Sequence, residues 1–322
     1  MTEWTPTGSP VVRLKGLGKS FRGHLGIGRT VAVEGLDLTV APGEICGLLG
    51  HNGAGKTTTI KMILGLLRPD RGSIELFGSP VSDPRVRARL GFLPENPYFY
   101  DYLTAREFLD FYGRLRGLTA AERGPRVARA IERVGLAGRE NVALRKFSKG
   151  MVQRLGLAQA ILHDPDLVIL DEPMSGLDPM GRREVRDLIL ALRDAGKSVL
   201  FSSHILQDVE MICDRVAILV RGKLRAVGRL EELVSRRVLW FEVAIAGELP
   251  RPVPGKVVSS SGEESLVHVP DVETLTKLLM AATRTGAQVT SVWPRRESLE
   301  DLFLREVQRE PAPPVPLELE HR

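Results

Sequence analysis

The sequence has little that would place it inside a membrane or in an oxidising compartment. None of its 322 residues belongs to a stretch approaching the roughly 20 apolar residues that a membrane-spanning helix needs. Residues 1–10 lack the apolar core of a signal peptide. Only two cysteines are present, Cys46 and Cys213, and each lies in an apolar run without the spacing of a metal site or a disulfide framework. We therefore expect a cytoplasmic protein with two small buried thiols.

An excess of charge of one sign is also missing. The chain has 45 basic and 40 acidic residues, and the net charge of +5 is small for this length. It does not indicate nucleic-acid binding, and we expect no nucleic acid partner. A hydrophobic content of 43% with 26% charged residues is typical of a folded globular protein, and the length suits two domains.

Over residues 11–230 short apolar runs alternate with helical patterns. The runs predicted as strands are 31–40, 44–49, 167–170 and 198–201. Helix is expected after the turn at 50–55 and near 181–194, and residues 96–160 are expected to form a mostly helical subdomain. The first of these helices has apolar residues spaced for one buried face: Ile60, Ile63, Leu64 and Leu67. Alternating strands and helices predict an α/β fold with a mainly parallel sheet covered on both faces.

The pattern changes after about residue 230. Leu239, Phe241, Val243 and Ile245 alternate with their neighbours like a half-buried strand. A helix is expected from Asp271, and Ser298 followed by Asp301 resembles a capping box that opens a last helix. Residues 231–308 are therefore predicted to form a small α+β accessory domain. The tail 309–322 is rich in proline and poor in apolar residues, which favours disorder.

Residues 50–57 fit a phosphate-binding loop of the Walker A type. Glycines at such a site let the backbone N–H groups curl around a phosphate, and the following helix directs its positive end at the same anion. Lys56 would neutralise phosphate charge, and the Thr57 hydroxyl would bind Mg²⁺. The alternative is a glycine-rich turn that matches by chance, which the strand before it and the amphipathic helix after it disfavour. The predicted ATP-binding residues of the segment are Gly50, His51, Asn52, Gly53, Ala54, Gly55, Lys56, Thr57 and Thr58.

A pair of acids follows the aliphatic run 167–170, 115 residues after Lys56 and Thr57. Charged residues at the carboxyl end of a buried strand lie where α/β folds bind ligands. Asp171 would help to hold Mg²⁺, and Glu172 is placed to orient or deprotonate the attacking water. Taken alone, the pair could be solvated acids at a strand end, and the phosphate loop makes that interpretation the weaker one.

Further motifs resemble those of the ATPase subunits of ABC transporters. Phe147-Ser148-Lys149-Gly150-Met151 resembles the family's signature sequence, Ser175-Gly176-Leu177-Asp178 its D-loop, and Ser203-His204 its switch histidine. The motifs stand in family order, and the resemblance covers about residues 11–230. It implies that the chain binds ATP with Mg²⁺ and hydrolyses it.

The resemblance also implies a dimer. Ser148, Lys149 and Gly150 at a helix start would face the γ-phosphate of an ATP held by a second ATPase subunit, either an identical copy or a paired one. His204 would contact the γ-phosphate and brace Glu172. Phe21 stands where an aromatic ring stacks on adenine, although a phenylalanine near a strand end is also a common core residue.

Two departures from the family pattern concern the site. Lys149 and Met151 replace residues of the signature consensus, while Ser148 and Gly150 remain. Glu95 stands where the family has a glutamine, and its carboxylate can still sense Mg²⁺ or water. Together with the motif 298–303, these residues resemble the exporter-type branch, which includes drug, lipid and sodium efflux ATPases.

The four tyrosines, Tyr98, Tyr100, Tyr102 and Tyr112, fall within fifteen residues that also hold Phe99, Phe108 and Phe111. We expect Phe108 and Phe111 to belong to the core of the helical subdomain. Three neighbouring hydroxyls are hard to bury, and half-wet aromatics suit an interface. In the family this segment receives a cytoplasmic helix of the permease, so Tyr98, Phe99 and Tyr100 are predicted to line that groove.

The chain is thus expected to be the ATPase of a transporter, peripheral on the inner face of the cell membrane, with integral permease subunits as partners. One alternative is a soluble ABC mechanoenzyme acting on ribosomes or DNA, which usually has two cassettes or a long coiled coil. A second alternative is a P-loop kinase, which would need neither Ser148 nor a dimer. The sequence contains no indication of the transported substrate.

Overall fold

The computed structural model describes residues 9–22, 28–234, 238–262 and 264–309. The chain divides into two compact units, Met1–Leu230 and Glu231–Arg322. The tail for which the sequence predicts disorder lies outside the described residues, apart from Arg309.

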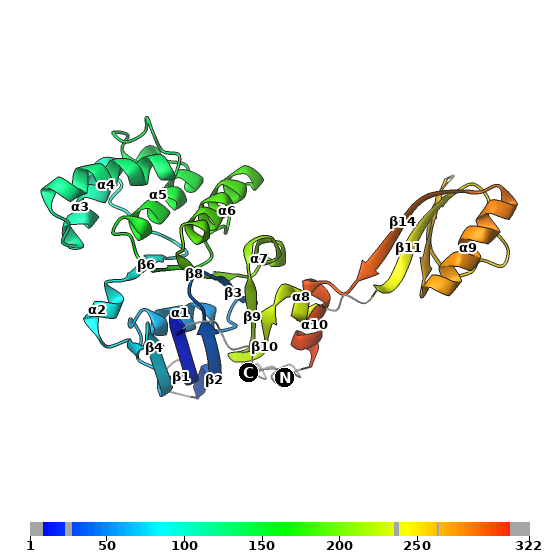
Figure 1. Ribbon diagram of the computed structural model, residues 1–322, viewed down its shortest axis with the longest axis horizontal. Coiled ribbons are helices and arrows are strands. Elements are labelled where there is room, and N and C mark those ends of the chain that lie inside the picture. The colour runs from blue at the N-terminus through cyan, green and yellow to red at the C-terminus, as the bar shows by residue number, and fades with distance from the viewer. Residues whose placement is uncertain (1–8, 23–27, 235–237, 263, 310–322) are drawn as a thin grey trace, which may run out of the picture. The chain divides into compact units, whose positions relative to one another are not determined.

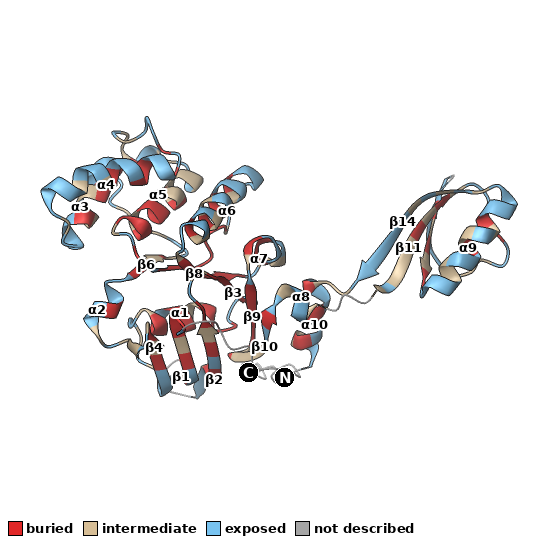
Figure 2. Ribbon diagram, in the orientation of Figure 1, coloured by how far each residue is buried: buried red, intermediate tan, exposed pale blue. Residues whose placement is uncertain are grey.

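In the described part of the first unit, a sheet of six strands has the order β10-β9-β3-β8-β7-β6 (Figure 1). Its strands are β3 (Ile45–Leu49), β6 (Leu90–Leu93), β7 (Leu167–Leu170), β8 (Ser198–Ser203), β9 (Arg215–Val220) and β10 (Lys223–Arg229). Neighbours from β9 to β6 run parallel, and β10 pairs antiparallel with β9 at one edge. Every residue of β3, β7, β8 and β9 is buried (Figure 2), as expected for strands covered on both faces. The predicted mainly parallel sheet is confirmed.

A second, antiparallel sheet was not predicted. Its order is β2-β1-β4-β5, and its strands are β1 (Val12–Arg22), β2 (Arg29–Val40), β4 (Arg71–Leu76) and β5 (Ser79–Pro80). The buried side chains of β1, including Val12, Leu14 and Leu17, belong to one apolar cluster with Ile60 and Ile63 of the helix α1 (Lys56–Ile63). Helix α1 ends before Leu64 and Leu67, which are only partly buried against the same cluster.

The helical subdomain has its own core. Its helices are α3 (Ala105–Leu115), α4 (Ala120–Arg133), the short 3₁₀ turn η2 (Leu144–Lys146) and α5 (Lys149–Ile161). Capping boxes at Thr104 and Thr119 open α3 and α4. The buried stripe of α3 includes Phe108, and the position of Phe111 on the helix turns its ring away from that stripe. Phe111 is 41% exposed, so its predicted place in the core is wrong.

Further helices among the described residues of the first unit connect its strands: α2 (Pro84–Arg87), α6 (Pro179–Asp194) and α7 (Leu206–Ile212). Asp178 caps α6 by accepting a hydrogen bond from the Gly181 N–H, and Pro179 stands at its first position. Cys46 on β3 is buried, while Cys213 at the end of α7 is partly exposed as a residue, and both are free thiols. The expected burial is confirmed for Cys46 in the core, whereas Cys213 is intermediate and its sulfur lies against Gly47 of β3.

The second unit contains an antiparallel sheet of order β12-β13-β11-β14. Its elements are α8 (Leu230–Leu233, beginning at the unit boundary), β11 (Val238–Ala246), β12 (Lys256–Ser261), β13 (Glu264–Val269), α9 (Val272–Thr285), β14 (Gln288–Arg296) and α10 (Leu299–Gln308). Helix α9 lies along one face of the sheet (Figure 1), and Leu278 packs there with Val243 and Ile245. The predicted helix start at Asp271 and the predicted capping box of Ser298 with Asp301 are confirmed, and Asp271 caps its helix by accepting a hydrogen bond from the Thr274 N–H.

Candidate active site

The phosphate loop connects β3 to α1, and its glycines are required by its shape. Gly53 and Gly55 have φ angles of 81° and 103°, in the left-handed region that favours glycine. A Cβ atom on Gly55 would lie 2.4 Å from the carbonyl oxygen of Ala32, and one on Gly50 would lie 2.6 Å from that of Leu219. The loop therefore packs tightly against β2 and β9 and leads directly into the N-terminus of α1, where backbone N–H groups can bind an anion.

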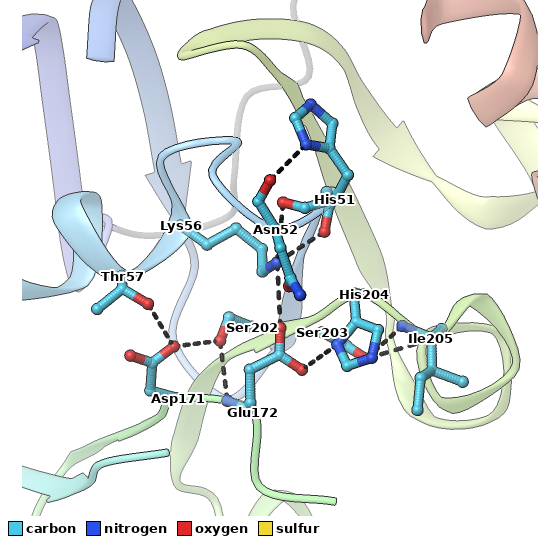
Figure 3. Close-up of polar contacts among 11 residues, drawn as sticks. His51, Asn52, Lys56, Thr57, Asp171, Glu172, Ser202, Ser203, His204 and Ile205 are labelled. Atoms are coloured by element: carbon cyan, nitrogen blue, oxygen red, sulfur yellow. Dashed lines mark hydrogen bonds and ion pairs between the residues drawn. The ribbon is translucent and has the colours of Figure 1, made fainter. Parts of the chain in front are cut away.

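Lys56 is buried at the first turn of α1 and points into the loop (Figure 3). Its Nζ donates hydrogen bonds to the carbonyl oxygens of Gly50 at 2.6 Å and His51 at 3.3 Å. It also lies 3.1 Å from Glu172 Oε1. That oxygen is buried and makes no well-aligned hydrogen bond, so the contact is an ion pair without hydrogen-bond geometry. A buried cation and an unsatisfied buried oxygen indicate a site that is completed by a ligand.

Glu172 follows β7 with a φ angle of 48°, an uncommon backbone conformation for a residue with a side chain. Its Oε2 lies 2.8 Å from Nδ1 of His204, which follows β8. If Nδ1 donates to this carboxylate, Nε2 is an acceptor in the neutral ring and can donate to a phosphate only when the ring is doubly protonated. Burial raises the pKa of the nearby Asp208 carboxyl, and the charge of Glu172 adds to that shift.

Asp171 faces the start of α1. The Thr57 hydroxyl donates a hydrogen bond of 3.3 Å to Asp171 Oδ1, and the Asp171 carboxylate is almost fully buried. Hydroxyl and carboxylate oxygens are the ligands that Mg²⁺ prefers, and Mg²⁺ usually takes its other ligands from phosphates and water. The described residues contain no cluster of three or more His, Cys, Asp or Glu side chains that could hold a metal alone. The oxygens present therefore fit a metal that arrives with a nucleotide.

Ser202, which the sequence analysis did not single out, connects these two acids. Its hydroxyl donates to Asp171 Oδ1 at 2.6 Å and accepts from the Glu172 N–H at 2.9 Å. Figure 3 shows the resulting chain of contacts from Thr57 through Asp171, Ser202 and Glu172 to His204. The available sequence signal was the pair of serines, Ser202 and Ser203, that follows the apolar residues of a buried strand.

The remaining predicted residues of the phosphate loop take different positions. His51 Nδ1 lies 2.7 Å from the carbonyl oxygen of Asn52, so its ring contacts the loop backbone and does not point toward Lys56 (Figure 3). Ala54 is buried in the main apolar cluster. Thr58 is partly buried in the first turn of α1.

Phe21 lies near the end of β1 and is 43% exposed, so it is not a core residue. Lys19 Nζ lies 5.9 Å from the centre of its ring. The ammonium group of Lys19 also holds the pKa of the Asp70 carboxyl well below its usual range, by donating a hydrogen bond of 2.8 Å. The strand end is thus held in place by Lys19 and Asp70, and Phe21 beside them is exposed to solvent.

The signature residues lie at the start of α5. Ser148 caps the helix by accepting a hydrogen bond from the Met151 N–H, and both Ser148 and Lys149 are exposed. Gly150 has open space where a Cβ would lie. The Lys149 side chain lies against Gly176, since a Cβ on that glycine would meet Lys149 Nζ at 2.1 Å. The structure does not bring these three residues into the cluster around Lys56.

Glu95 is exposed just after β6. Strand β6 pairs with β7 in a parallel register that sets Leu93 beside Leu170. Glu95 and Asp171 therefore follow the carboxyl ends of two neighbouring strands. A carboxylate at this edge can approach a ligand bound beside Asp171.

A lysine buried in a glycine loop, with two carboxylates beside the loop at the end of a parallel strand, is typical of P-loop ATPases. The sequence pattern of the ABC transporter family matches residues 33–175. An uncharacterized ABC transporter ATP-binding protein of Synechocystis sp. is 42% identical over 308 residues, or 95% of this chain and 87% of the relative. Nod factor export ATP-binding protein I of Ralstonia nicotianae is 33% identical over 312 residues, or 94% of this chain and 95% of the relative.

A solved ATP-binding subunit of an ABC transporter is 34% identical and superposes with a TM-score of 0.62, covering 69% of this chain and 91% of the other. The chain belongs to the ATP-binding proteins of ABC transporters, and it binds and hydrolyses ATP. Among the described residues, no helix has the length and apolar character needed to span a membrane.

Proposed function

We propose that the chain drives transport through separate membrane permease subunits by closing a dimer around two ATP molecules and reopening it on hydrolysis. The observation that carries the proposal is the position of Glu172, between Lys56 Nζ at 3.1 Å and His204 Nδ1 at 2.8 Å. Those contacts put a carboxylate at the mouth of the phosphate loop, where a γ-phosphate and its attacking water would lie.

The proposed roles follow from the contacts. Lys56 and the loop N–H groups would hold the β- and γ-phosphates, and Thr57 and Asp171 would hold Mg²⁺. When bound, Mg²⁺ neutralises charge on the phosphates. Glu172 orients the attacking water or takes its proton, and His204 holds the Glu172 carboxylate in place. Glu95 would face the metal from the neighbouring strand end.

The Lys56–Glu172 ion pair has a consequence for the order of events. A phosphate competes with Glu172 for the Lys56 ammonium, because both are anions and the ammonium is buried between them. Once the phosphate takes over Lys56, Glu172 keeps its contact with His204 and has an oxygen available for water. Nucleotide binding would therefore itself release the base that hydrolyses the nucleotide.

We also propose that each ATP site is shared by two subunits. Ser148 and Lys149 are exposed residues at the N-terminus of α5, where the Ser148 hydroxyl and the first backbone N–H groups of the helix would be available to an anion. Mixing a Lys56→Ala variant with a Ser148→Arg variant tests this arrangement. Each variant alone should be inactive, and an equal mixture should regain up to about a quarter of normal turnover, since half of the symmetric dimers would be mixed with one intact site. A mixture as inactive as its components would contradict the proposal.

The permease would dock on the exposed aromatics before α3. Tyr98 is 92% exposed and Tyr100 is 50% exposed, whereas the ring of Phe99 packs 4.3 Å from that of buried Phe108. Tyr98 and Tyr100 would contact the permease, and Phe99 would anchor this segment to the core of the helical subdomain. Replacing both tyrosines with Ala should abolish co-purification with membranes that contain the permease while leaving basal ATPase activity unchanged. Normal recruitment of that double variant would refute the docking proposal.

The direction of transport, the location of the chain and the role of its second unit are also part of the proposal. The name of the Ralstonia nicotianae relative records export of Nod factor by that system. We propose that this chain also serves an exporter, that it lies on the cytoplasmic face of the membrane, and that residues 231–308 act as an accessory domain.

A further inference from the structure

Ser202 occupies the end of β8 as a fully buried hydroxyl. Leu170 pairs with Phe201 in the parallel register of β7 and β8, so Ser202 lies beside the point where β7 gives way to Asp171. The side chains of Val199, Leu200 and Phe201 before it are apolar and buried. A hydroxyl in such a place needs partners within the protein, because water does not reach it.

Its partners are the two acids of the proposed catalytic centre. The Ser202 hydroxyl donates to Asp171 Oδ1 at 2.6 Å, and its oxygen accepts from the backbone N–H of Glu172 at 2.9 Å. Asp171 Oδ1 also accepts from Thr57 at 3.3 Å. One hydroxyl therefore uses both its donor and its acceptor capacity, and in doing so it fixes how Asp171 and Glu172 stand relative to each other (Figure 3).

The contact to Glu172 supports a backbone that would otherwise relax. At a φ angle of 48° this residue is held in a conformation that side chains disfavour, and such a conformation persists only where surrounding contacts over-determine it. The bond from the Glu172 N–H to Ser202 is one such contact. A shift of this backbone would move the Glu172 carboxylate away from both Lys56 and His204.

We infer that Ser202 is a positioning residue of the ATPase, which aims the Asp171 carboxylate at the metal and holds the backbone that presents Glu172 to water. The inference rests on the roles proposed for Asp171 and Glu172. Ser202 itself touches neither substrate nor metal and acts through its two hydrogen bonds. Partners of this kind, one layer behind a metal ligand, are worth about 10- to 100-fold in metal affinity or activity.

The test compares Ser202→Ala, which removes both hydrogen bonds, with Ser202→Thr, which keeps the hydroxyl. Ser198→Ala is the control, because Ser198 is a buried serine at the other end of the same strand and accepts a hydrogen bond from the Gly43 N–H at 2.9 Å. Two quantities are measured on the full chain. They are kcat for ATP with saturating Mg²⁺ and the affinity for Mn²⁺, followed by electron paramagnetic resonance with a non-hydrolysable ATP analogue bound.

Ser202→Ala should lower both kcat and Mn²⁺ affinity by about 10- to 100-fold, while Ser202→Thr and Ser198→Ala remain near the parent protein. If Ser202→Ala does not fold, Ser202→Cys keeps the side-chain volume with only a weak donor and acceptor, and should show the same losses. Unchanged Mn²⁺ affinity in Ser202→Ala or in Ser202→Cys would mean that Ser202 has only a structural role, whether or not the melting temperature falls. That result would overturn the inference.

Two reference variants separate this outcome from failure of the proposed function. Asp171→Asn and Glu172→Gln should both lower turnover by about a hundred-fold or more if the proposed roles are correct. If they hydrolyse ATP normally, the assignment of the site fails. If they are inactive while Ser202→Ala behaves like the parent protein, only the inference about Ser202 fails.

Discussion

Glu172→Gln should change three properties of the protein at once. The amide cannot take a proton from water, so turnover should fall by about a hundred- to ten-thousand-fold, the usual contribution of a positioned base. The amide is also neutral, so the ion pair with Lys56 at 3.1 Å is lost. The ATP-free protein should therefore become less stable, and ATP should bind more tightly.

The size of the last two effects follows from the geometry. At an effective dielectric constant of 20, two unit charges 3.1 Å apart attract by about 5 kcal/mol. Part of this attraction is offset because the substitution also relieves the cost of removing the Glu172 carboxylate from water, and Lys56 keeps its hydrogen bonds to two loop carbonyls. A net contribution of about 1–2 kcal/mol corresponds to ATP binding that is about 5- to 30-fold tighter. The free energy of unfolding of the ATP-free protein should fall by a similar amount, because the same ion pair is lost in both comparisons.

The assay is titration with a fluorescent ATP analogue, paired with urea unfolding of the ATP-free protein. Glu75→Gln is the matched control, since Glu75 is a partly exposed acid on β4 whose side chain lies 4.0 Å from Arg13. Equal or weaker nucleotide binding by Glu172→Gln would refute the competition between Glu172 and phosphate for Lys56. Normal turnover by that variant would remove Glu172 from the chemistry altogether.

Further outcomes are expected elsewhere in the molecule. Phe21→Ala should weaken ATP binding by about 5- to 100-fold, the value of one stacked base, while Phe21→Trp should preserve it in the same titration. Burial, aided by the charge of Arg116, lowers the pKa of His163 from its ordinary value of 6.5 to about 4. The neutral ring favours the folded state, so stability should be complete above pH 6.5 and fall as the pH drops toward 4. Because the ring is only partly buried, the loss should be on the order of 2 kcal/mol, and His163→Gln should flatten this slope in urea unfolding at pH 7 and pH 5. Burial also raises the pKa of the Cys46 thiol to about 12 and that of Cys213 well above its usual value. Neither thiol should react with an aromatic disulfide reagent until the protein unfolds, and rapid labelling of the native protein would contradict this.

Structural features that depend only on consecutive residues could be predicted from the sequence. The phosphate loop is eight residues long, and its glycines have local reasons to be there, such as the φ angle of 103° at Gly55. The cap at Ser298 and the buried strand before Asp171 are equally local. In each case the physical cause acts within a few residues along the chain, so no knowledge of distant contacts was needed.

Structural features that depend on which strands pair could not be predicted from the sequence. Strand-like runs in residues 11–94 were visible, but nothing in them showed which strands pair with which, because strand pairing joins residues that are far apart in the chain. The direction of a side chain on a helix or loop posed the same difficulty. Phe111 and Tyr98 face water, whereas Phe99 packs inward against Phe108, and only the packed subdomain separates them.

The sequence by itself identified this protein as an ATPase with a glycine loop and a pair of acids after a buried strand, since each of these motifs is contiguous in the chain. Only the tertiary structure decided that Lys56 is paired with Glu172 and that Ser202 joins the two acids. The physical reason is that β3, β7 and β8 meet side by side although they are far apart in the chain. Contacts between their ends are set by the register of the sheet.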